Sequence, residues 1–297
     1  MATQITNGDG AASVSALNCI DLSSSDTHRS VSLLKQACLD CGFFYLLNHG
    51  ISEEFMAEVF DQSRRLFELP LSAKMELLRN KNYRGYTPYL DQHLDHENQV
   101  EAYYIGVELQ EDDPEAKGSE CLCMCVDKHV INVRSMLEIV GFPLGIYSYL
   151  LPSLQLCSAE YRRVRFLVTR EVAKSVGRLV ALALDLDIHF FDKPEMLGEA
   201  IQTLGLLHYD GWCSFVIYIG QVSDPANAIF GAGAHSDFGF RTLLATDDVV
   251  GLQICKDKDA KPQVWEHVPP IKGSFTVNLG DMLERWSNVF SSTAPLP

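Results

Sequence analysis

The second half of the chain consists of short apolar segments separated by clusters of Gly, Asp, Asn and Pro. Segments of this length between turn residues are typical of antiparallel strands, and several in succession indicate a double-sheet sandwich or barrel. The sequence therefore predicts a mainly β region. The predicted strands are 204–209, 229–236, 241–246, 250–255, 263–268 and 274–279.

The first half of the chain contains helical patterns as well. Val31, Leu34, Ala37 and Cys38 recur at helical spacing and are followed by Gly42, which suits a helix closed by a left-handed residue. A second helix is expected after Ser52, with an apolar face made of Phe55, Val59, Phe60, Leu66 and Phe67. We further expect a buried strand at 43–47, a loop at 84–88, a strand at 100–107 and a helix at 171–184.

Composition limits the classes of partner and compartment. The net charge is -15, which would repel nucleic-acid phosphates and anionic membrane surfaces, so we expect no nucleic-acid partner. The first residues lack the basic start and apolar stretch of a secretory signal, and the number of cysteines, nine, is odd. We therefore expect a cytoplasmic protein with reduced thiols, including the alternating Cys121, Cys123 and Cys125.

One uncharged stretch, 139–158, is long enough to span a membrane. Gly141, Pro143, Gly145 and Pro152 interrupt it as a continuous lipid-facing helix. We therefore predict no membrane span.

The pattern with the clearest chemistry is His235-Ser236-Asp237, which falls within or beside a predicted strand. Residues two apart on a strand point to the same face, so an imidazole and a carboxylate can converge there on one metal ion. With a second imidazole they would form the facial triad of non-haem iron(II) sites. The spacing alone is weak, because it recurs at His93 and Asp95, and a surface histidine is the alternative interpretation.

The motifs around this pair resemble a known family, the plant-type 2-oxoglutarate- and Fe(II)-dependent oxygenases. In the second half these motifs are G-A-H-S-D-F-G at 233–239, T-L-L at 242–244, G-L-Q-I at 251–254, W-x-x-V-P-P at 265–270 and N-L-G-D-M-L-E-R-W-S-N at 278–288. In the first half they are I-D-L at 20–22, G-F-F-x-x-x-N-H-G-I at 42–51, F-x-L-P at 67–70 with Lys74, and R-G-Y-x-P at 84–88.

The resemblance implies an α+β, mainly β fold, a double-stranded β-helix (jelly roll) with N-terminal helices. It implies that His235 and Asp237 are the first two Fe(II) ligands and that Tyr209 helps to hold the 2-oxoglutarate co-substrate; an ordinary core tyrosine is the alternative at that position. It also implies oxidation of a small organic metabolite, with ascorbate as a supporting reductant.

The sequence departs from the family pattern in three places, 119–168, 212–220 and 289–297. At the last of these the family has its second histidine ligand, followed later by an arginine that grips 2-oxoglutarate, whereas this chain has Pro295. The only histidine after Asp237 is His267, for which we expect a structural role. We interpret the chain as a truncated or alternatively spliced form.

This interpretation has consequences for the fold and the activity. We expect missing C-terminal strands, self-association through exposed edges, weakened 2-oxoglutarate binding and doubtful activity. A non-catalytic isoform or binding module with a degenerate iron site is the alternative, and a cupin-like metal protein is a third. The expected organisation is a disordered lead-in (1–18), an N-terminal oxygenase domain (19–118), an atypical segment (119–168) and an incomplete oxygenase core (169–297).

Overall fold

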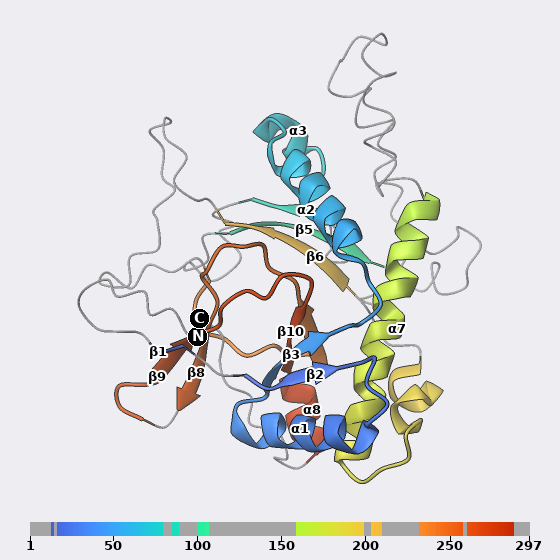
Figure 1. Ribbon diagram of the computed structural model, residues 1–297. Helices are drawn as coiled ribbons and strands as arrows, with labels where there is room; N and C mark the ends of the chain where they lie inside the picture. The colour runs from blue at the N-terminus through green and yellow to red at the C-terminus, as the bar shows by residue number, and fades with distance from the viewer. Residues whose placement is uncertain are drawn as a thin grey trace. The chain divides into compact units, whose positions relative to one another are not determined.

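In the computed structural model, drawn as a ribbon in Figure 1, the chain folds into two units. Unit 1 contains residues 1–53, 173–193 and 233–297, and unit 2 contains residues 54–172 and 194–232. Both units therefore combine segments that are far apart in the sequence. The structure describes residues 13–14, 17–79, 85–88, 100–106, 159–198, 203–209, 232–257 and 260–287.

Unit 1 is built around a four-stranded sheet, here called the central sheet. Its strands lie in the order β2 (Cys19–Asp21), β3 (Phe43–Leu47), β10 (Phe275–Leu279) and β7 (Arg241–Leu244). The β3–β10 and β10–β7 pairs are antiparallel, and β2 runs parallel to β3. Every residue of β10 is buried, so both faces of this strand are covered.

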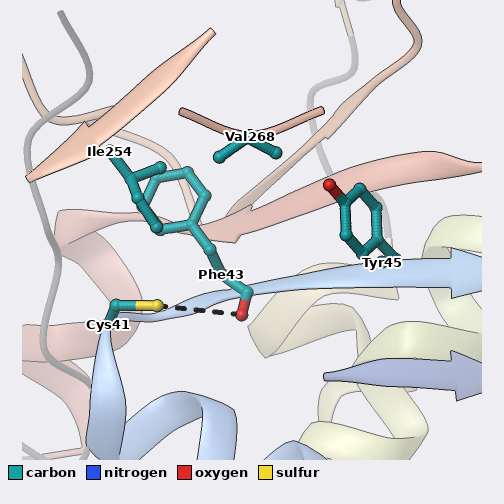
Figure 2. Packing of buried hydrophobic residues seen from close by; sticks show 5 residues of the cluster. All are labelled: Cys41, Phe43, Tyr45, Ile254 and Val268. Atoms are coloured by element: carbon teal, nitrogen blue, oxygen red, sulfur yellow. Dashed lines mark hydrogen bonds between the residues drawn. The ribbon is translucent and has the colours of Figure 1, made fainter. Parts of the chain in front are cut away.

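A smaller sheet in unit 1 joins β1 (Ser13–Val14), β9 (Val264–His267) and β8 (Gln253–Asp257). Phe43 and Tyr45 are alternate residues of β3, so both side chains leave the same face of the central sheet. They pack with Ile254 of β8 and Val268, which follows β9 (Figure 2). This face, the inner face of the central sheet, is therefore covered by the smaller sheet. The strand β1 of the smaller sheet lies within residues 1–18, where the sequence predicts a disordered lead-in.

The first helix, α1 (Thr27–Asp40), confirms the helical spacing of Val31 to Cys38 and ends just before Gly42, as the sequence predicts. The Asp26 carboxylate accepts a hydrogen bond from the backbone N–H of Arg29, which caps the first turn. Gly42 has φ +75°, a conformation that glycine adopts at little cost, and its N–H donates to the Ala37 carbonyl at 2.8 Å. The helix lies against β2 and β3 (Figure 1).

The Asn48-His49-Gly50 turn after β3 is held by the buried imidazole of His49. The Nδ1 atom accepts a hydrogen bond from the Ile51 N–H at 3.2 Å, so Nε2 carries the proton and donates to the Gly273 carbonyl at 3.0 Å. The ring also packs on Phe275, the first residue of β10. Burial lowers the pKa of His49, because the charged imidazole loses its hydration, although the bond to Gly273 opposes the shift.

Unit 2 contains a three-stranded antiparallel sheet in the order β4 (Gly85–Thr87), β5 (Glu101–Gly106) and β6 (Thr203–His208). Two helices, α2 (Glu53–Phe67) and α3 (Leu71–Met75), precede it in the chain. The strand β4 corrects the prediction of a loop at 84–88. Three residues that begin with Gly85 and are followed by Pro88 give little sequence signal, and it is the pairing of Tyr86 with Tyr103 on β5 that makes them a strand.

A buried carboxylate, Glu101, ties the three strands of this sheet together. It is 2% exposed and accepts hydrogen bonds from Lys74 Nζ at 2.6 Å, the Tyr86 hydroxyl at 2.5 Å and His208 Nδ1 at 2.8 Å. Burial by itself would raise the pKa of Glu101, but the bonds from His208, Lys74 and Tyr86 lower it below its usual value. The Lys74 ammonium also donates to the Phe67 carbonyl at 2.9 Å, which fixes the connection between α2 and α3.

The remaining elements are α7 (Ala159–Ala183), η3 (Phe190–Asp192), η4 (Pro194–Gly198) and α8 (Asp281–Trp286). The helix predicted at 171–184 is thus confirmed, but it begins at Ala159, inside the segment predicted to be atypical. No helix in the described ranges is long and apolar enough to cross a membrane. The stretch 139–158, the Cys121–Cys125 cluster and the segments 212–220 and 289–297 lie outside the described residues.

We predict that Glu101→Gln lowers the free energy of unfolding by about 3–5 kcal/mol, because it leaves the buried Lys74 ammonium without a countercharge. Urea-induced unfolding of the variant and of Glu68→Gln, an exposed control in the same unit, would measure the difference. The double variant Lys74→Met/Glu101→Gln should recover part of the loss. Equal stability of Glu101→Gln and Glu68→Gln would contradict the role of this carboxylate.

A second prediction concerns pH. Because the pKa of His49 is lowered in the folded state, the unfolded state binds more protons once the pH falls below about 6.5, and folding stability then decreases. The wild-type protein should therefore lose more stability between pH 7.5 and 5.5 than His49→Gln does. Parallel denaturation curves at the two pH values test this, and an identical loss in both proteins would contradict it.

Candidate metal centre

His235 and Asp237 lie in a loop that leads into β7. In the described part of the strand predicted at 229–236, residues 232–236, the prediction is wrong, because these residues contain only a single β-bridge position, at His235, and no strand. The backbone that follows bonds to the start of α8 instead of to a neighbouring strand. The N–H of Asp281 donates to the Asp237 carbonyl at 2.9 Å, and the N–H of Gly280 donates to the Phe240 carbonyl at 3.1 Å.

Gly280 allows this close approach of two backbone segments. A Cβ atom at this position would lie 2.2 Å from the Gly239 carbonyl oxygen and 2.6 Å from the Asp237 carbonyl oxygen. Both contacts are far shorter than van der Waals separations and involve backbone, which cannot rotate away. The glycine of the N-L-G-D motif is therefore needed for the loop to lie where it does.

The Asp237 carboxylate is fixed by two side chains of the central sheet. Its Oδ2 atom accepts a hydrogen bond from the Thr242 hydroxyl on β7 and one from Asn278 Nδ2 on β10 at 2.8 Å. Thr242 and Asn278 are paired across the two strands, and Asn278 is paired on its other side with Phe43. Because directly paired residues share a face, the carboxylate is held at the inner face of the sheet.

The His235 imidazole faces the other oxygen of this carboxylate. Its Nδ1 donates to the Gly233 carbonyl at 2.8 Å, so in the neutral ring Nε2 carries the lone pair. Nε2 lies 3.6 Å from Asp237 Oδ1. That separation is too long for a hydrogen bond, but it suits two donors that each bind one ion at about 2.1 Å.

The two groups influence each other's ionisation. Burial would raise the pKa of Asp237, but His235, Thr242 and Asn278 together lower it to about 2. The neighbouring Asp237 carboxylate raises the pKa of His235, against the effect of burial. A carboxylate that stays ionised beside an oriented imidazole is a donor pair of the kind that binds a divalent transition metal.

Two comparisons of the sequence bear on what this pair does. Residues 17–125 match the family model described as non-haem dioxygenase in morphine synthesis N-terminal, and residues 211–295 match that of the 2OG-Fe(II) oxygenase superfamily. The chain is 39% identical over 293 residues to azadirone synthase LFS of Melia azedarach, covering 97% of this chain and 79% of that protein. Kihadalactone A synthase LFS of Citrus sinensis is 39% identical over 276 residues, 92% of this chain and 73% of that protein.

The chain belongs to the 2-oxoglutarate- and Fe(II)-dependent oxygenase superfamily. A solved structure, that of the dioxygenase for auxin oxidation in rice, is similar with a TM-score of 0.61 at 21% identity, covering 94% of this chain and 76% of that one. This likeness confirms the predicted double-stranded β-helix fold with N-terminal helices. The described strands of this oxygenase form three sheets and do not close into a barrel.

The other residues singled out from the sequence of this oxygenase are not part of the pair. Tyr209 follows β6 in unit 2, where it is 47% exposed, whereas His235 and Asp237 lie in unit 1. His267 ends β9, and its Nδ1 is buried without a hydrogen-bond partner in the described part of the chain. Within those same residues no three His, Cys, Asp or Glu side chains come together as a metal site.

Sequence reasoning gave no role to Thr242, Asn278 or Gly280, although all three lie in the family motifs. Asn278 stands out in retrospect, because a strand that reads Phe-Thr-Val-Asn-Leu places an amide where an apolar residue is expected. A buried amide needs a hydrogen-bond partner, and the sequence does not say which.

We predict that Gly280→Ala destabilises this oxygenase by about 1–3 kcal/mol or more, because the new Cβ forces the 237–240 loop off α8. Gly239→Ala is a matched control, since a Cβ at Gly239 meets nothing within 4 Å. Thermal unfolding of the two variants would measure the effect. A Gly280→Ala variant as stable as Gly239→Ala would show that the contact is relaxed in solution.

Proposed function

We propose that the chain binds Fe(II) through His235 Nε2 and Asp237 Oδ1 and, as its family does, uses 2-oxoglutarate as co-substrate to oxidise a small organic metabolite. The observation that carries this proposal is the 3.6 Å separation of these two donors, each oriented by a hydrogen bond through its other polar atom. With dioxygen as the oxidant, bound iron and 2-oxoglutarate would supply the oxidising chemistry, in which 2-oxoglutarate would be converted to succinate and carbon dioxide.

The residues of the chain hold and orient the ion in this proposal. The Gly233 carbonyl fixes the tautomer of His235, and the Thr242 hydroxyl of the central sheet fixes the orientation of the Asp237 carboxylate. Both metal-binding atoms are therefore oriented before a metal ion binds. Tyr209 is proposed as a 2-oxoglutarate contact. The two relatives at 39% identity are each named for an organic product, kihadalactone A and azadirone, which supports a small organic metabolite as the substrate class here.

A second function, a non-catalytic isoform or binding module, is favoured by one observation. Two donors, His235 and Asp237, come together among the described residues, and no third His, Cys, Asp or Glu of those residues joins them. With these two protein ligands alone, we expect iron and 2-oxoglutarate to be bound weakly and turnover to be slow, with ascorbate supporting the activity. Self-association and a cytoplasmic location stay predictions from the sequence.

The proposal predicts that His235→Ala weakens Mn(II) or Fe(II) binding by more than about 100-fold, since losing a ligand costs more than losing one of its supporting partners. His267→Ala is the control and should bind the metal like the wild-type protein. Calorimetric or paramagnetic titration gives the dissociation constants. Equal binding by His235→Ala and the wild-type protein would exclude this pair as the metal centre.

Succinate formation distinguishes the two functions. The wild-type chain is incubated with Fe(II), 2-oxoglutarate and ascorbate, and His235→Ala is treated in the same way. Succinate that is lost in the variant supports the oxygenase, whereas metal binding without succinate supports the non-catalytic isoform.

A further inference from the structure

The two oxygens of the Asp237 carboxylate have different surroundings. Oδ2 accepts hydrogen bonds from both Thr242 and Asn278, whereas Oδ1 is the oxygen that lies 3.6 Å from His235 Nε2. The side chain of Asp237 is 24% exposed, and Asn278 is 3% exposed. The asymmetry is therefore built by strand residues, the partly buried Thr242 of β7 and the buried Asn278 of β10.

This asymmetry matters because of the number of positions around the metal. A carboxylate that binds through one oxygen occupies one position, and a site with three protein ligands then leaves the remaining positions open for co-substrate and oxygen. If both oxygens bound the ion, one of those positions would be taken. A carboxylate with one oxygen already hydrogen-bonded to two donors is held in the one-oxygen mode.

We propose that Thr242 and Asn278 are positioning residues: their hydrogen bonds occupy Oδ2 of Asp237, so that this carboxylate binds the metal ion through Oδ1 alone. The inference rests on the proposed function, because it concerns the same metal centre. Neither residue contacts the ion itself. Both act through Asp237, from adjacent strands and in register with each other.

The position of these two residues is itself fixed by the sheet. Asn278 is paired with Thr242 on one side and with Phe43 on the other, so a slip of one residue in either pairing would turn the amide away from Asp237. Phe43 packs with Ile254 in the core of unit 1, which holds that register (Figure 2). The orientation of one ligand oxygen is thus tied to the packing between the two sheets.

The test uses Co(II) as the probe and the full chain. Thr242→Val removes the hydroxyl at nearly constant volume, and we expect it to weaken Co(II) binding by about 10-fold or more, the range found when a supporting partner of a ligand is lost. Its visible Co(II) spectrum should also change, since the released Oδ2 alters the coordination. Thr242→Ser keeps the hydroxyl and should restore both the affinity and the spectrum.

Thr276→Val is the matched control. Thr276 is a buried threonine two residues before Asn278, on the same face of β10, and it makes no hydrogen bond to Asp237 in the structure. This variant should retain the wild-type affinity and spectrum, while Asn278→Ala should behave like Thr242→Val. If Asn278→Ala does not fold, the comparison of Thr242→Val with Thr242→Ser decides alone.

The possible failures are distinguishable. If His235→Ala abolishes Co(II) binding but Thr242→Val binds as tightly as the wild-type protein, or more tightly, with an unchanged spectrum, the positioning role is wrong and the metal centre stands. If Co(II) binding is indifferent to His235→Ala as well, the proposed metal centre itself is wrong.

Discussion

The hydrogen bonds from Thr242 and Asn278 to Asp237 join the loop that carries both candidate ligands to the central sheet. Asp237 is not part of a strand, and its backbone carbonyl bonds to the start of α8. Its position is therefore set from two sides, by side chains of β7 and β10 and by the close approach at Gly280. A loop anchored in this way gains the precision that a regular strand would otherwise provide.

Glu101, which is buried, and Asp237, which is partly buried, show how the same group takes different roles. Both oxygens of Glu101 accept hydrogen bonds from side chains, with Lys74 and Tyr86 on one and His208 on the other. Such a group is satisfied and serves to hold strands together. In Asp237 the two side-chain donors share one oxygen, and the other oxygen lies 3.6 Å from His235 Nε2, too far for a hydrogen bond. This difference separates a structural carboxylate from one suited to an ion.

The first half of the chain contributes directly to the sheet that supports the ligands. β3 pairs with β10, and the His49 ring beyond β3 bonds to Gly273 and packs on Phe275 at the start of β10. The N-H-G-I motif therefore stabilises the strand that carries Asn278, although the two are more than 200 residues apart. The pairing also crosses the boundary between the segments 19–118 and 169–297 that the sequence suggests as separate domains.

Local patterns predicted the regular elements well, because periodicity and turn residues are local properties. The end of α1, predicted at Gly42 and found at Asp40, and the strands β6 to β10 lie within a few residues of their predicted bounds. The strand β4 and the loop 232–240 were missed because long-range partners decide their conformation: β5 for the first and the start of α8 for the second. The roles of Thr242 and Asn278 were missed for the same reason, since a register is a property of the folded sheet.

The orientation of the donor pair is independent of the third ligand that the family pattern calls for. His235 is oriented by Gly233 of its own loop, and Asp237 by residues of β7 and β10. Adding or losing another donor changes how tightly an ion is held, because each ligand contributes to the binding free energy, but it leaves these hydrogen bonds in place. Affinity and geometry are therefore separable at this centre: the described residues determine the geometry, and the complete set of ligands determines the affinity.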